Sequence, residues 1–223
     1  MAISPETEED GMITLKNGET LLFLGDSITD CGRHQNGISN LGTGYPNLFS
    51  AFFRVRYPEV LINFINKGTG GNKTPDILAR LQTDVLDLHP DVVTLLIGIN
   101  DVWRFYENPG SGFGVSAEDY RENLKEIIEP ILASGARMLI MTPYFIDTNP
   151  YEPMRTQVLE YAAICKQIVR QYEIETIELQ PVFEDLMKRG LTSYILSGDR
   201  VHPKAAGHAA IAQELFKHIQ VQH

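Results

Sequence analysis

The chain has 223 residues, 43% of them hydrophobic and 22% charged, and 29 acidic residues against 19 lysines and arginines leave a formal charge of −10. This balance is typical of a globular domain that folds without a disulfide or a metal. It argues against nucleic acid and against an anionic membrane as main partners, because both need clustered basic residues. No apolar stretch approaches the roughly 18 residues of a membrane span. The acidic N-terminus lacks the apolar core of a signal peptide, so we expect a cytoplasmic protein.

Short apolar strands alternate with amphipathic helices after a polar segment, residues 1–12, that we expect to be a flexible tail. The segment 153–172 shows the helical signal clearly, because its apolar residues fall on one stripe of period 3.6. In chain order the sequence predicts strand 21–24, helix 45–57, strand 60–65, helix 74–88, strand 92–97, helix 116–134, strand 138–142, helix 153–172, strand 175–179 and helix 203–220.

Five strands that alternate with helices predict a parallel sheet covered by helices on both faces. Right-handed crossovers then favour a single doubly wound α/β domain over residues 13–223, with the flavodoxin-like strand order 2-1-3-4-5. The segment 107–114 contains three glycines and one proline, which predicts a mobile loop that is a candidate lid. Sites in this fold form at the carboxyl ends of the strands, so the residues after each strand are the candidates for function.

The first strand is followed by Gly25, Asp26 and Ser27. The glycine permits a sharp turn, and Ser27 would lie at a helix start, where a nucleophile is exposed. Asp and Ser are equally typical N-caps without chemistry, and this segment alone does not separate the two interpretations.

The second and third strands are followed by candidate hydrogen-bond donors. The glycine-rich segment 66–74 fits neither a phosphate loop nor a dinucleotide fingerprint, but its glycines are compatible with a backbone N–H donor close to a ligand. Asn100 is either a turn residue or an amide that points into a site.

Asp199 and His202 precede the last predicted helix. A carboxylate three residues before a histidine can bond one ring nitrogen and leave the other as a base of fixed tautomer. Taken alone, this segment favours a capping aspartate beside a packed histidine. Asp199, His202 and His208 could also bind a metal, but neither HExxH nor CxxC occurs, so we expect no metal and no cofactor.

The predicted strand order brings these segments together, because it places the Ser27 loop between the loops of Gly71 and Asn100. With the Asp199–His202 pair, the set contains the nucleophile, base, base-orienter and oxyanion donors that acyl transfer needs. The α/β-hydrolase signature G-x-S-x-G is absent, which indicates a different serine hydrolase design.

The four segments, in this order, resemble the four blocks of the SGNH, or GDSL, hydrolase superfamily, and the similarity extends from about residue 19 to the end of the chain. Within that superfamily, four segments resemble the intracellular bacterial acetylxylan esterases, which act on acetylated xylo-oligosaccharides. These segments are residues 25–33, 98–104, 141–143 and 199–203.

The resemblance implies Ser27 as nucleophile, His202 as base and Asp199 as its orienter. It implies the N–H groups of Ser27 and Gly71 and the side chain of Asn100 as oxyanion donors. Gly71 is preferred to its neighbour Gly70 because the glycine of the family lies five residues after the leading asparagine of its block.

We further expect substrate contacts from Asp26, Trp103 and Tyr144, although packing is an equally good role for Trp103. The expected partner is a small-molecule or oligosaccharide ester, and the resemblance also suggests a homo-oligomer. Three alternatives stay open: a broad short-chain esterase, thioesterase or lysophospholipase with the same residues, a carbohydrate-binding module without catalysis, and a metal-dependent hydrolase.

Overall fold

The computed structural model describes residues 12–35, 40–107, 110 and 113–222. The predicted tail, apart from Met12, therefore lies outside the described residues. So do residues 108–109 and 111–112 of the predicted loop 107–114.

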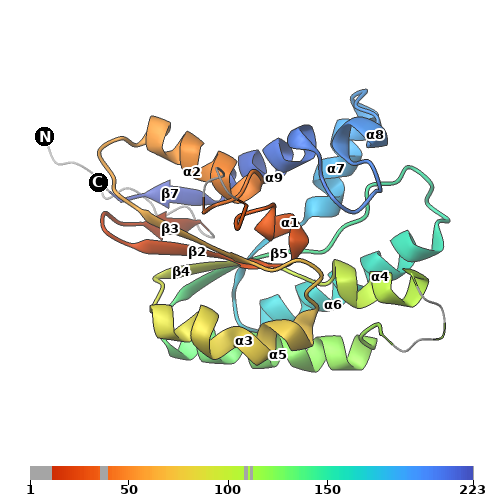
Figure 1. The fold of residues 1–223 in the computed structure, drawn as a ribbon, viewed down its shortest axis with the longest axis horizontal. Helices are drawn as coiled ribbons and strands as arrows, with labels where there is room; N and C mark the ends of the chain where they lie inside the picture. The colour runs from red at the N-terminus through yellow and green to blue at the C-terminus, as the bar shows by residue number, and fades with distance from the viewer. Residues whose placement is uncertain (1–11, 36–39, 108–109, 111–112, 223) are drawn as a thin grey trace, which may run out of the picture.

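A five-stranded parallel sheet forms the centre of the molecule (Figure 1). Its order is β3-β2-β4-β5-β6, which is the predicted order 2-1-3-4-5. The strand predicted over 60–65 begins three residues later, at Asn63. Val60 and Ile62 are apolar because they are buried in the segment before the strand, not because they belong to it. The five strands are β2 (Thr20–Gly25), β3 (Asn63–Gly68), β4 (Val92–Leu96), β5 (Arg137–Met141) and β6 (Glu175–Ile177).

Helices cover both faces of this sheet (Figure 1). On one face α2 (Tyr45–Arg56) packs against α9 (Ala205–Lys217). On the other face α5 (Ala117–Ala133) packs between α3 (Thr74–Asp84) and α6 (Pro153–Gln171). These are the five predicted helices, shortened at one or both ends.

Aromatic side chains fill the layer between β2 and α2. The Phe23 ring of β2 lies 6.0 Å from the Phe49 ring of α2, and Phe49 lies 5.6 Å from Phe216 of α9. Edge-to-face and tilted contacts of this kind add to the burial of large rings. The packing holds the two helices on the sheet beside the end of β2 that carries Gly25.

Several shorter elements were not predicted from the sequence. The last predicted helix, 203–220, was too long, because α9 ends at Lys217 and the chain continues as a strand that pairs in parallel with a strand near the N-terminus. No helix among the described residues has the length and apolar character to cross a bilayer. The elements that were not predicted are β1 (Ile13–Leu15), a 3-10 turn (Leu86–Leu88), α4 (Ile99–Glu107), α7 (Leu179–Lys188), α8 (Ser193–Leu196) and β7 (Ile219–Val221). The helix start expected at Ser27 is that of α1 (Ser27–Asp30).

The register of the central strands aligns the loops that carry the candidate chemistry. Gly25, the last residue of β2, pairs with Gly68 of β3 and with Leu96 of β4. A Cβ at Gly25 would lie 2.3 Å from the Thr29 hydroxyl, so only glycine lets α1 fold back this closely. The three strands therefore end at the same level, at one edge of the sheet.

Candidate active site

Ser27 is the first residue of α1, and the residue before it caps that helix. Asp26 Oδ1 accepts the Ile28 N–H at 2.9 Å, so Asp26 is the N-cap and Ser27 follows it. The N-cap is therefore Asp26, and the candidate nucleophile, Ser27, is the residue after it. Asp26 is fully buried. Burial raises its pKa to about 7, the Ile28 bond opposes that rise, and the nearby Asp101 adds to it.

This buried carboxyl predicts an unusual dependence of stability on pH. The folded state keeps the Asp26 proton up to about pH 7, whereas the ordinary value is 3.8. Between these values the unfolded chain binds fewer protons, so this group lowers stability as the pH rises. Asp26→Asn keeps the capping oxygen and removes the titration. We expect its free energy of unfolding, relative to the parent, to rise by about 3 kcal/mol between pH 5 and pH 8.

Urea unfolding of both proteins at the two pH values measures that difference. Equal pH dependence in parent and variant would contradict the buried, proton-holding state of Asp26.

The C-terminal turn brings His202 to Ser27. Ser27 Oγ lies 2.9 Å from His202 Nε2, and His202 Nδ1 lies 2.7 Å from Asp199 Oδ2. An ionised carboxylate only accepts, so Nδ1 carries the ring proton and Nε2 is left to accept from the serine hydroxyl. The three side chains therefore form one continuous hydrogen-bonded chain from Ser27 through His202 to Asp199.

Asp199 is fixed in place by its own backbone neighbours. Its Oδ1 accepts the N–H groups of Val201 at 3.0 Å and His202 at 2.8 Å. Burial alone would raise the Asp199 pKa, but the bonds from His202 and Val201 lower it to about 2. Arg200 between them has φ 71°, which the compact turn imposes. Asp199 therefore stays ionised at any pH near neutrality.

Ser197 supports the same turn, and no sequence signal had marked it. Its buried hydroxyl donates to the His202 carbonyl at 2.7 Å and lies 3.1 Å from Asp199 Oδ1. Tyr144, expected to contact substrate, also belongs to this support. Its ring is buried against Phe183, and its hydroxyl donates to the Val201 carbonyl at 3.4 Å.

Gly71 and Asn100, the donors expected from the two neighbouring loops, also lie close to each other. Gly71 has φ +77°, which glycine adopts readily, and its backbone belongs to the loop that leads into α3. Asn100 is buried in the first turn of α4, where its Nδ2 donates to the Asn72 carbonyl at 3.0 Å. That bond uses one of the two amide hydrogens, so the other remains to donate to an oxyanion.

Asp101 joins the same two loops, a contact the sequence analysis did not foresee. Its carboxylate accepts from the Thr74 hydroxyl at 2.6 Å and from the Thr74 N–H at 3.0 Å. Burial raises the Asp101 pKa to about 6, although the Thr74 bonds oppose that rise. The start of α3 is thereby held against the start of α4.

The three residues expected to contact substrate differ in exposure. Trp103 lies beside the base, with its ring 5.6 Å from the His202 ring in an edge-on arrangement, and it is partly exposed. Asp26 and Tyr144 are buried, and each makes a hydrogen bond to a backbone group, Asp26 to the Ile28 N–H and Tyr144 to the Val201 carbonyl.

His208, considered above as a metal ligand, is held by other groups. Its Nδ1 accepts the Tyr45 N–H at 3.3 Å, and its Nε2 lies 3.3 Å from the Cys31 sulfur. Burial lowers the pKa of His208 to about 4, so the ring is neutral. Across the described part of the chain, no three His, Cys, Asp or Glu side chains gather as metal ligands would.

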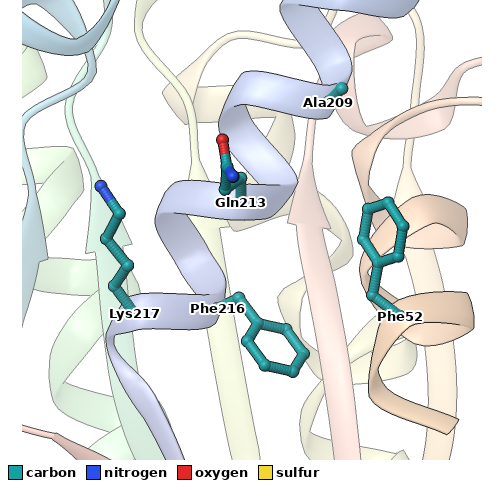
Figure 2. Close-up of a pocket in the computed structure, with 5 residues that line it drawn as sticks. All are labelled: Phe52, Ala209, Gln213, Phe216 and Lys217. Atoms are coloured by element: carbon teal, nitrogen blue, oxygen red, sulfur yellow. The ribbon is translucent and has the colours of Figure 1, made fainter. Parts of the chain in front are cut away.

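A shallow apolar groove of about 500 Å³ opens between α2 and α9 (Figure 2). Its aromatic wall is Phe52 of α2 and Phe216 of α9, with Gln213 and Lys217 beside them. It holds none of the groups that acyl transfer needs, so it is not part of the candidate active site.

Known proteins of similar sequence identify the family of the chain. The profile of the GDSL-like Lipase/Acylhydrolase family matches residues 23–210. An acetylxylan esterase of Geobacillus stearothermophilus is 36% identical over 208 residues, which cover 91% of this chain and 94% of that protein.

Solved structures support the same grouping. A crystal structure of that acetylxylan esterase superposes with a TM-score of 0.87 at 35% identity, covering 92% of this chain and 96% of the other. An α/β hydrolase from the metagenome of Lake Arreo, Spain, gives a TM-score of 0.86 at 33% identity, covering 91% and 95%. The chain belongs to the GDSL-like lipase/acylhydrolase family and is a carboxylic ester hydrolase.

Proposed function

We propose that this protein is a serine esterase that removes small acyl groups, above all acetyl, from xylo-oligosaccharides through an acyl-enzyme. The observation that carries the proposal is the continuous bonding of Ser27 Oγ to His202 at 2.9 Å and of His202 to Asp199 at 2.7 Å. The relative from Geobacillus stearothermophilus supports it, since structures of that protein with alanine in place of a serine, a histidine or an aspartate are described as catalytic mutants.

In the proposed mechanism, His202 Nε2 takes the Ser27 proton while Oγ attacks the ester carbonyl carbon. The carbonyl oxygen becomes an oxyanion, which accepts bonds from the Ser27 and Gly71 N–H groups and from the Asn100 amide. The tetrahedral intermediate collapses, and the sugar alcohol leaves with the proton from His202. Water then attacks the acyl-enzyme with His202 again as base, and the acid is released.

Ionised Asp199 contributes to each of these steps. It holds the Nδ1 proton of His202 and stabilises the imidazolium that forms when Nε2 is protonated.

The oxyanion role of Asn100 predicts a specific kinetic defect. Asn100→Ala removes a donor whose bond strengthens as the carbonyl oxygen gains charge, so kcat should fall by roughly 10²–10³-fold with little change in KM. Steady-state kinetics on a soluble acetyl ester measure both constants. A defect confined to KM would argue against an oxyanion role and for one in ground-state binding.

The acetylated sugar is supported by the similarity to an acetylxylan esterase and by Trp103, whose ring lies beside His202 and could stack on a sugar. The competing candidate is a broad short-chain esterase, thioesterase or lysophospholipase with the same residues. The cytoplasmic location expected above and a homo-oligomer, which the resemblance suggests, belong to the proposal as well. Size-exclusion chromatography with light scattering measures the assembly.

One experiment tests the substrate class. Rates are compared on acetylated xylo-oligosaccharides and on acetyl, butyryl and octanoyl esters of a common alcohol. We expect kcat/KM to be highest for the acetylated sugars and to fall with acyl length. A maximum at octanoyl would reject the sugar-acetate assignment, and no turnover together with no labelling by a fluorophosphonate would reject catalysis itself.

A further inference from the structure

Arg80 lies in α3, outside the set of residues that sequence or resemblance assigned to the site. Its side chain is only 16% exposed, and all three of its guanidinium nitrogens donate hydrogen bonds. Nε donates to the Asn72 side-chain oxygen at 2.8 Å, Nη1 to the Lys67 carbonyl at 2.8 Å, and Nη2 to the Gly25 carbonyl at 3.0 Å.

These three acceptors lie at the ends of two strands and in one loop beside Ser27. Gly25 is the last residue of β2, two residues before the proposed nucleophile. Lys67 lies at the end of β3, and Asn72 follows Gly71, the proposed backbone donor of the oxyanion hole. The third donor is reached through Asn72, because the Asn72 carbonyl accepts the Asn100 amide at 3.0 Å. One guanidinium group thus connects the end of β2, the end of β3 and the Gly71 loop directly, and Asn100 through Asn72.

The chemistry of this contact requires arginine. A guanidinium group is a rigid planar fork with five N–H donors, whereas a lysine ammonium is a compact point charge on a flexible stem. Asp84 holds the fork in place, because its carboxylate accepts from Arg80 Nη1 at 2.8 Å and from Lys67 Nζ at 3.0 Å. Burial alone would raise the Asp84 pKa, but the bonds from Arg80 and Lys67 lower it.

We propose that Arg80 is a positioning residue of the oxyanion hole, which sets the Gly71 and Asn100 donors relative to Ser27. The proposal rests on the serine esterase function given above. An oxyanion donor acts only when it lies within hydrogen-bond distance of the place where charge develops. A shift of about 1 Å in catalytic geometry can cost on the order of 10²-fold in rate.

The first test is Arg80→Lys, with kcat, KM and thermal unfolding measured together. We expect kcat to fall by roughly 10–100-fold while KM changes little and the protein stays folded. The matched control is Arg189→Lys, because Arg189 also pairs with an aspartate one helical turn away, Asp185, but is 72% exposed. The control should retain parental kcat. A folded Arg80→Lys variant with parental kcat, or with a defect in KM alone, overturns the proposal.

A trifluoromethyl ketone separates positioning from general loosening of the fold. Addition of Ser27 to its carbonyl gives an oxyanion that occupies the hole, so its inhibition constant should rise in Arg80→Lys in parallel with the loss of kcat/KM. An unchanged inhibition constant overturns the proposal. Methylguanidinium added to Arg80→Ala should restore part of kcat and leave the parent unaffected.

Asn72→Ala provides a second variant if the Arg80 variants unfold. It removes one acceptor of the fork and keeps the backbone carbonyl that holds Asn100. We expect a smaller kcat loss that is not additive with Arg80→Lys, since both act through one contact. Parental kcat in Asn72→Ala, or full additivity, contradicts the proposal. Parental esterase activity that survives Ser27→Ala would instead reject the underlying function.

Discussion

Replacing Ser27 by alanine is expected to lower kcat by roughly 10⁴-fold or more while the protein stays folded. The substitution removes the only atom that can attack the ester carbon in the proposed mechanism, and it leaves His202 without the hydroxyl 2.9 Å from its Nε2. Folding should survive, because the α1 cap is made by Asp26 and Ile28 rather than by the Ser27 side chain. Steady-state kinetics and circular dichroism check the two parts.

A matched serine controls for position in the helix. Ser193 is the first residue of α8, another four-residue helix, and follows an N-cap threonine as Ser27 follows an N-cap aspartate. Ser193→Ala should keep parental activity and react with a fluorophosphonate, whereas Ser27→Ala should not react. Near-parental hydrolysis by Ser27→Ala would show that another group is the nucleophile.

Asp199→Asn is expected to lower kcat by roughly 10⁴-fold with little change in KM. The physical reason lies in the local bonding. The N–H groups of Val201 and His202 point at Oδ1 and will hold the oxygen of an asparagine in the same place. The NH₂ group then faces His202 Nδ1, where it donates and forces the ring proton onto Nε2. A protonated Nε2 cannot accept the serine proton.

Asp147→Asn serves as the control, since Asp147 pairs with Arg200 in the same turn at 2.8 Å but is not bonded to His202. It should alter kcat little. If both variants lose activity equally, turn stability rather than the tautomer of His202 explains the defect.

Periodic patterns predicted the larger elements well, because each depends on local chemistry. Ser116, the first residue of the predicted helix 116–134, caps α5, with its hydroxyl accepting the Asp119 N–H at 3.1 Å. The strand order 2-1-3-4-5 also followed, since parallel strands with right-handed crossovers allow few alternatives. The short strands β1 and β7 were missed because their pairing joins the two ends of the chain, and three residues carry no periodic signal.

A sequence gives the type of a residue but not its depth in the fold. Asp26 and Tyr144 were expected to contact substrate, and in the structure Asp26 turns inward as a helix cap while Tyr144 packs beneath the His202 turn. Arg80 went unnoticed because nothing in its helical neighbourhood shows that the ends of β2 and β3 and the Asn72 side chain meet at its guanidinium.

Local patterns were enough to predict the sheet and the residue types proposed for acyl transfer, because motif chemistry and hydrophobic period act over a few residues. Which groups contact one another depends on the tertiary structure. The 2.9 Å approach of Ser27 and His202 joins positions 175 residues apart, and the Arg80 bond to Gly25 spans 55. Such distances depend on how whole layers pack, and no local pattern encodes them.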